Sequence, residues 1–226
     1  MRILSSLLIV AALTAAASAR PAPQFAQAPH ADLMEMAPTY DRATVRAMLA
    51  EARARNLAAF HAYATAGVYP SNVYQPGALN VWRDQDGHFC AAATIIRQSG
   101  EVALTDKVAE QTNFIRLADV SQGPLMDWML TSGLTQEELV AIQKPFNPVV
   151  EKPQPAPETR LALDATLRAA ETTRLKKVYA QVELQLAKST QKSLDTAVDR
   201  LMKHPALIET LDEQSSRVKT DGATRS

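Results

Sequence analysis

The residue types that could do chemistry gather in one short stretch of this chain. Asp84, Asp86 and His88 place two carboxylates and an imidazole close together in the sequence. Oxygen and nitrogen ligands of this kind suit Ca²⁺ or a transition metal. The stretch lacks the third acidic position and the distal glutamate of a complete calcium loop. We therefore favour the alternative, in which both carboxylates accept hydrogen bonds from backbone amides of a tight turn, and we expect no metal or other cofactor.

The single cysteine offers a second kind of chemistry. Cys90 follows His88 by two positions, and His61 is the other histidine considered as its base. A thiol activated by histidine would make the chain a small hydrolase or transferase. On a strand, residues two apart have Cβ atoms roughly 6 to 7 Å from each other, which is too long for a direct hydrogen bond between these side chains. We favour a buried structural thiol, because three alanines typical of close packing follow it.

A third group of side chains suits binding rather than reaction. Its members carry aromatic rings, planar amides or a guanidinium group: Tyr69, Asn72, Tyr74, Asn80, Trp82 and Arg83. Such groups suit sugars, peptides or cationic ligands. Period-two alternation would place Asn80, Trp82 and Asp84 on one strand face, either exposed or lining a site. In the alternative, the rings pack the base of a loop and the asparagines bond its backbone.

The segment that must position these residues reads as an ordered loop followed by a β-hairpin. Residues 68–77 contain two prolines, a glycine and two tyrosines, which is typical of such a loop. Asp86 and Gly87 supply a turn between a first strand at about 78–84 and a second at about 88–93. The apolar run that starts at Ala91 would also fit a helix, so the end of the second strand stays open.

A long helix is predicted before this segment. It begins at an N-cap, Asp41, and ends at Gly67, which suits the left-handed residue after a helix. Arg53 and Arg55 are expected to face solvent. Together with the hairpin and the shorter helices that follow, it forms a globular core over residues 39–143.

Shorter helices are predicted after the hairpin, so the fold class is mainly α. One covers about 101–112, and another begins near Pro124 and ends at Gly133. Thr135 and Glu138 form a capping box for a third, which runs to about residue 143.

The C-terminal part of the chain is separated from this core by a proline-rich linker, residues 144–157. Residues 158–203 contain neither Gly nor Pro, and a continuous helix of that length would reach roughly 69 Å. It must project, break, or pair with another protein or a second copy of the chain. Heptads are not strict, so packing along the first helix is favoured over a parallel coiled coil. Residues 204–226 read as a short helix and a frayed tail.

The N-terminus predicts export. Residues 1–19 combine a basic start, an apolar run and the small-residue pattern Ala17-Ser18-Ala19, typical of a cleaved signal peptide. A flexible leader rich in Pro and Ala follows at residues 20–38. We expect a periplasmic or secreted protein with no integral membrane segment after cleavage.

The balance of positive and negative residues argues against one class of function, nucleic-acid binding. The chain has 24 basic and 24 acidic residues, so its formal net charge is zero. Nucleic-acid binding needs clustered cations to replace phosphate counterions, and we exclude it. The sequence therefore favours an exported, non-enzymatic binding or assembly protein whose recognition surface lies in the central module, residues 68–93. The alternative is the hydrolase or transferase that uses Cys90.

Overall fold

The computed structural model describes residues 40–74, 79–143, 159 and 161–224 of the chain. All of them belong to one compact unit, Pro38–Ser226. The predicted signal peptide, leader and linker (1–19, 20–38 and 144–157) lie outside the described residues. Within the described part, no helix combines the length and apolar character that crossing a membrane requires.

Helix α1, Arg42–Ala66, confirms the long helix predicted first. The Asp41 carboxylate accepts a hydrogen bond from the Thr44 amide at 2.9 Å, which satisfies a backbone donor at the helix start. Gly67 follows the last turn with φ of 68°, the left-handed conformation that only glycine adopts without strain. Both ends of the helix are therefore encoded locally.

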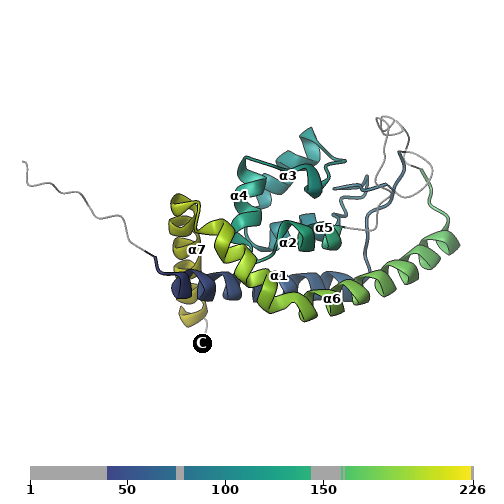
Figure 1. Ribbon diagram of the computed structural model, residues 1–226. Helices are drawn as coiled ribbons and strands as arrows, with labels where there is room; N and C mark the ends of the chain where they lie inside the picture. The colour runs from purple at the N-terminus through teal and green to yellow at the C-terminus, as the bar shows by residue number, and fades with distance from the viewer. Residues whose placement is uncertain (1–39, 75–78, 144–158, 160, 225–226) are drawn as a thin grey trace, which may run out of the picture. The chain divides into compact units, whose positions relative to one another are not determined.

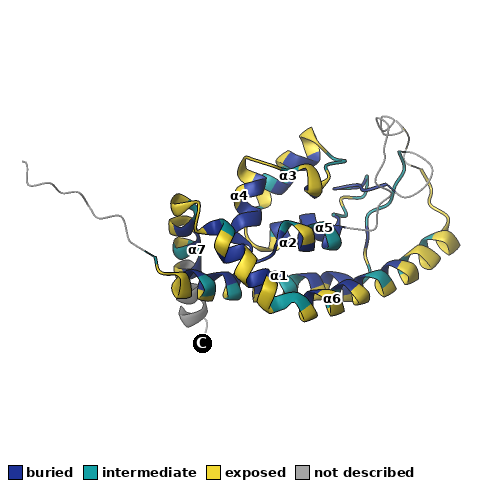
Figure 2. Cartoon of the chain, viewed as in Figure 1, coloured by how far each residue is buried: buried dark blue, intermediate teal, exposed yellow. Residues whose placement is uncertain are grey.

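Helix α6, Ala165–Leu201, is continuous over 37 residues. It packs along α1, and Figure 1 shows the two helices side by side. The face of α6 that is buried is apolar along most of its length: Leu175, Tyr179, Val182, Leu186, Leu194, Val198 and Leu201. Figure 2 shows this division into a buried and an exposed face. The apolar stripe of the long helix is thus covered within one chain.

The remaining helices are short, apart from the last. Their bounds are α2 Ala91–Gln98, α3 Val102–Gln111, the 3₁₀ helix η1 Leu117–Asp119, α4 Pro124–Thr131, α5 Gln136–Gln143 and α7 Pro205–Thr224. The mainly α class is confirmed. Helix α7 continues well beyond the short helix expected after His204.

The predicted β-hairpin is wrong, since the described residues contain no strand. A single antiparallel bridge joins Arg83 to Phe89 across the turn. The second strand cannot continue because α2 begins at Ala91 and packs on α1. Alanine favours helix, and burial of one face of α2 against α1 decides between two conformations that the local sequence left open.

The expectation that Arg53 faces solvent is also wrong. Its side chain is buried and forms a two-bond ion pair with Glu138, with N–O distances of 2.7 and 2.8 Å. Glu138 belongs to the predicted capping box, which is confirmed: its carboxylate accepts from the Thr135 amide at 3.0 Å. The same ion pair therefore caps α5 and ties it to α1.

Candidate functional site

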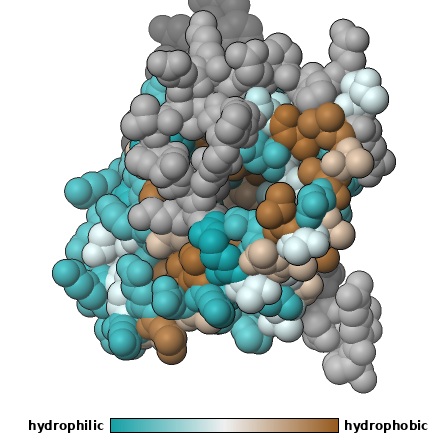
Figure 3. Space-filling view, turned by 90° about the vertical axis from the view of Figure 1, so that its right-hand side faces the viewer, coloured by the Kyte–Doolittle hydropathy of each residue, from teal (hydrophilic) through white to brown (hydrophobic). Residues whose placement is uncertain are grey.

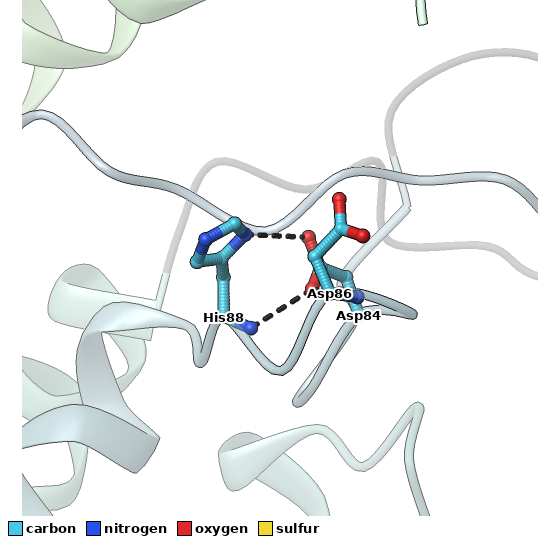
Figure 4. Close-up of side chains that lie close together, drawn as sticks. All are labelled: Asp84, Asp86 and His88. Carbon is cyan, nitrogen blue, oxygen red and sulfur yellow. Dashed lines mark hydrogen bonds and ion pairs between the residues drawn. The ribbon is translucent and has the colours of Figure 1, made fainter. Parts of the chain in front are cut away.

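The acidic turn is organised around the buried carboxylate of Asp84. Its Oδ1 accepts hydrogen bonds from the Asp86 and His88 amides, each at 2.9 Å. Its Oδ2 accepts from the Ser71 amide at 2.9 Å and lies 3.2 Å from the His88 Nδ1. Figure 4 shows the His88 ring and backbone both directed at this carboxylate. Asp84 therefore holds the turn together and attaches it to the preceding loop.

A cation bound here would have to compete with the hydrogen bonds that the Asp84 carboxylate already accepts. Potential ligand atoms of Asp84, Asp86 and His88 lie within 4.8 Å of one another, a spacing compatible with one ion. Both Asp84 oxygens already accept from N–H donors, and these bonds shape the turn. The geometry favours the turn interpretation over the metal interpretation.

Trp82 belongs to the core. Its side chain is fully buried, and its indole Nε1 donates to the Thr105 carbonyl at 3.0 Å. Asn80 and Asp84 are buried as well, so the strand face that was expected to be exposed or to line a site is largely enclosed. Alternation alone could not reveal this, because α3 and the segment after it cover the turn.

Cys90 is buried close to Tyr63 and Tyr179. Burial raises the pKa of its thiol to about 12, so the thiol stays protonated near neutral pH. Both histidines considered as its base contact carboxylates instead: His88 contacts Asp84, and His61 contacts Glu183 at 2.9 Å. Within the described residues, no hydrogen bond joins Cys90 to either ring. The structure does not assemble a Cys–His pair.

A cavity of about 730 Å³ lies between residues 69–72 and 79–81 on one side and the N-terminal part of α6 on the other. Three of the six residues predicted to bind a ligand line it, namely Tyr69, Asn72 and Asn80, and Cys90 lines it as well. Figure 3 views the molecule from this end, where apolar and polar side chains lie next to each other. The structure thus brings half of the predicted binding residues to one enclosed space.

The other three predicted binding residues lie elsewhere. Tyr74 packs edge-on against Phe114, with ring centroids 4.8 Å apart. The Arg83 guanidinium lies 5.8 Å from the centroid of the Phe89 ring. Together with buried Trp82, they support the fold around the turn and are not among the residues that line the cavity.

The residues on the α6 side of the cavity were not predicted as site residues from the sequence. This side contributes four charged side chains, Asp164, Arg168, Glu171 and Arg174, and the apolar Leu163, Leu167, Leu175, Val178 and Tyr179. These residues lie some hundred positions from Tyr69, beyond the proline-rich linker. The local hint was the cluster of leucines at the start of α6, which remain partly exposed although they are apolar.

A second groove, of about 750 Å³, lies between α3, η1 and α4. It is more open and mostly apolar, and none of the predicted site residues lines it. We place the candidate site in the cavity beside α6, because specific ligand sites combine an apolar lining with a few fixed polar groups.

No family model matches this chain, and no curated protein or solved structure matches it.

Proposed function

We propose that this chain is an exported, non-enzymatic binding protein whose ligand occupies the cavity beside α6. The observation that carries the proposal is the convergence of Tyr69, Asn72 and Asn80 on that cavity. Its volume of about 730 Å³ falls within the range of about 300 to 1,000 Å³ that small-molecule sites occupy. Export is proposed from the signal-peptide pattern at residues 1–19.

Binding has more support than catalysis. The alternative, a hydrolase or transferase that uses Cys90, needs a thiolate or a base in contact with the thiol. The raised pKa of Cys90 and the carboxylate partners of His88 and His61 lend that chemistry no support.

An assembly role for residues 158–203 also has less support. The apolar stripe of α6 already packs along α1, so a second copy of the chain is not needed to cover it. We therefore propose ligand binding as the function and leave association through α6 as a prediction.

A pair of tryptophan substitutions on α6 tests the proposal. Val178 lines the cavity, so Val178→Trp should obstruct it, whereas Leu184 is 63% exposed and lies outside it. Ligand-observed NMR with a library of small organic fragments provides the measurement. We expect fragments that bind the wild type and Leu184→Trp but not Val178→Trp.

Melting temperatures of the two variants serve as the control for folding. A library that yields no binders, or binders that Val178→Trp retains at unchanged affinity, would refute the cavity as the binding site. Val81→Phe, which reaches the cavity from the opposite wall, repeats the test if Val178→Trp does not fold.

A further inference from the structure

Asn80 lines the cavity and carries a hydrogen-bond acceptor that has no partner among the described residues. Its side chain is 3% exposed, and its Nδ2 donates to the Ile115 carbonyl at 3.0 Å, which fixes the orientation of the amide. The Oδ1 atom is buried without a hydrogen-bond partner among the described residues. Leaving a buried acceptor unpaired costs about 1 to 3 kcal/mol. An N–H or O–H group on a bound ligand would satisfy it.

Arg168 brings to the same cavity a positive charge that has no ion-pair partner among the described residues. Its guanidinium group donates to the Ser71 hydroxyl and to the Tyr69 carbonyl, both of which are neutral. No carboxylate of the described residues forms an ion pair with it. A cation near the N-terminus of a helix also opposes the helix dipole, so local helix stability does not account for Arg168. An anionic ligand would complete its environment.

The other charged side chains that line the cavity have partners among the described residues. Arg174 binds both oxygens of Glu171, at 2.7 Å each. That bond lowers the pKa of Glu171 and raises the pKa of Arg174, so both stay charged and their charges cancel. The Asp164 carboxylate accepts from the Leu167 amide and caps α6. Of the two arginines, Arg168 is the one without an ion pair to a described carboxylate, so it is the group that an anionic ligand would contact.

The rest of the wall suits an apolar body. The aliphatic side chains Leu79, Val81, Leu163, Leu167, Leu175 and Val178 line it, and Tyr69 and Tyr179, with ring centroids 5.4 Å apart, close one side. Leu163 and Leu167 are 37% and 71% exposed, which leaves apolar surface for a ligand to cover.

We infer that the ligand is an amphiphilic carboxylic acid whose apolar body carries a hydrogen-bond donor. The carboxylate pairs with Arg168, the donor satisfies the Asn80 Oδ1, and the apolar body lies against the aliphatic wall. This inference rests on the proposed function, because it names the class of compound that the same cavity takes.

Dansylamino-undecanoic acid is a suitable probe, because it combines a carboxylate, an aliphatic chain and a sulfonamide N–H. Fluorescence titration compares it with its methyl ester, which lacks the charge. For the wild type we expect the acid to bind about tenfold more tightly than the ester, a difference of about 1.4 kcal/mol. For Arg168→Gln, which keeps N–H donors for Ser71 and Tyr69, we expect acid and ester to bind equally.

Lys177→Gln is the matched control, since it removes one positive charge from the exposed side of α6, away from the cavity. It should keep the preference for the acid. The N-methylated sulfonamide, which lacks the donor, should bind the wild type about fivefold more weakly than the parent acid. This comparison tests Asn80 without a substitution that could unfold the protein.

The outcomes separate the inference from the function on which it rests. Equal binding of acid and ester by the wild type, abolished by Val178→Trp, would overturn the carboxylate class and leave cavity binding intact. A methylated probe as tight as its parent would overturn the role of Asn80. Failure of all probes overturns the inference, and the fragment screen then decides whether the cavity binds ligands at all.

Discussion

At the scale of single residues, the ion pair between Arg53 and Glu138 is the main polar contact inside the fold. Both side chains are less than 10% exposed. Arg53 also donates to the carbonyls of Gly133 and Leu186, and Glu138 accepts from the Ser189 hydroxyl. Two charges can be buried together only when hydrogen bonds replace the lost water. This network provides most of them, although the Arg53 Nε has no partner among the described residues.

Glu138→Gln is expected to lower the free energy of unfolding by about 3 kcal/mol at pH 7, because it leaves the buried guanidinium group of Arg53 without a counter-charge. Burial alone would raise the pKa of Glu138, but the hydrogen bonds from Arg53 and the Thr135 amide lower it below the ordinary value of 4.5. The stability that this carboxylate contributes is therefore present above about pH 4.5 and is lost as the pH falls through its lowered pKa. In urea denaturation, the free energies of unfolding of the wild type and the variant should therefore converge as the pH falls below about 4.5.

Glu137→Gln is the control. The Glu137 carboxylate is exposed, so its loss should change the free energy of unfolding little. A difference between wild type and Glu138→Gln that stays constant from pH 7 to pH 3 would contradict this account.

At the scale of elements, the turn between α4 and α5 approaches α1 more closely than a side chain allows. Gly133 has φ of 74°, and a Cβ atom there would overlap the Leu49 carbonyl and lie 2.7 Å from the Arg53 amide nitrogen. This contact brings the start of α5, with Glu138, to the level of Arg53. Glycine is required here by both backbone conformation and space.

Gly133→Ala is expected to lower the free energy of unfolding by more than about 2 kcal/mol, since it combines left-handed strain with a backbone clash. Gly87→Ala provides a matched comparison, because Gly87 has φ of 82° and nothing within 4 Å of an added Cβ. Urea denaturation should show a cost of only about 1 kcal/mol for Gly87→Ala, from strain alone. Equal losses in the two variants would mean that the close approach to α1 contributes nothing.

At the scale of the molecule, α1 and α6 are joined along their lengths although a proline-rich segment and the whole central module separate them in the sequence. Leu186 is 1% exposed, and its carbonyl accepts a hydrogen bond from Arg53 of α1. We expect the two helices to unfold as one cooperative unit, because α6 buries much of its apolar face against α1.

Leu186→Ala should lower the free energy of unfolding by about 3 kcal/mol through the lost burial and the cavity left behind. Hydrogen exchange should show faster amide exchange in α1 and α6 together. Leu184→Ala, at a position 63% exposed on the same helix, should change stability by less than about 0.5 kcal/mol. Faster exchange confined to α6 would show that the helices open independently.

For the proposed binding site, the sequence predicted some of the residues on one side of the cavity. Tyr69 and Asn72 of the predicted loop and Asn80 of the predicted strand were named as candidate binding residues, and the structure places all three on the cavity. The sequence did not predict Arg168, because its environment depends on contacts with Ser71 and Tyr69 nearly a hundred residues away. The site itself is formed by packing between segments that no local pattern connects.

The sequence by itself determined the ends of α1, at Asp41 and Gly67, and the capping box of α5. It also predicted one long helix in the C-terminal part, but α6 begins at Ala165 rather than at residue 158. Caps and periodicity act over a few residues, so they can be read without the fold. Only the tertiary structure decided that Ala91 starts a helix rather than continuing a strand, that Trp82 is core, and that Arg53 is buried. Each of these depends on which apolar surfaces and opposite charges meet across the chain, since burial and charge pairing are set by neighbours distant in sequence.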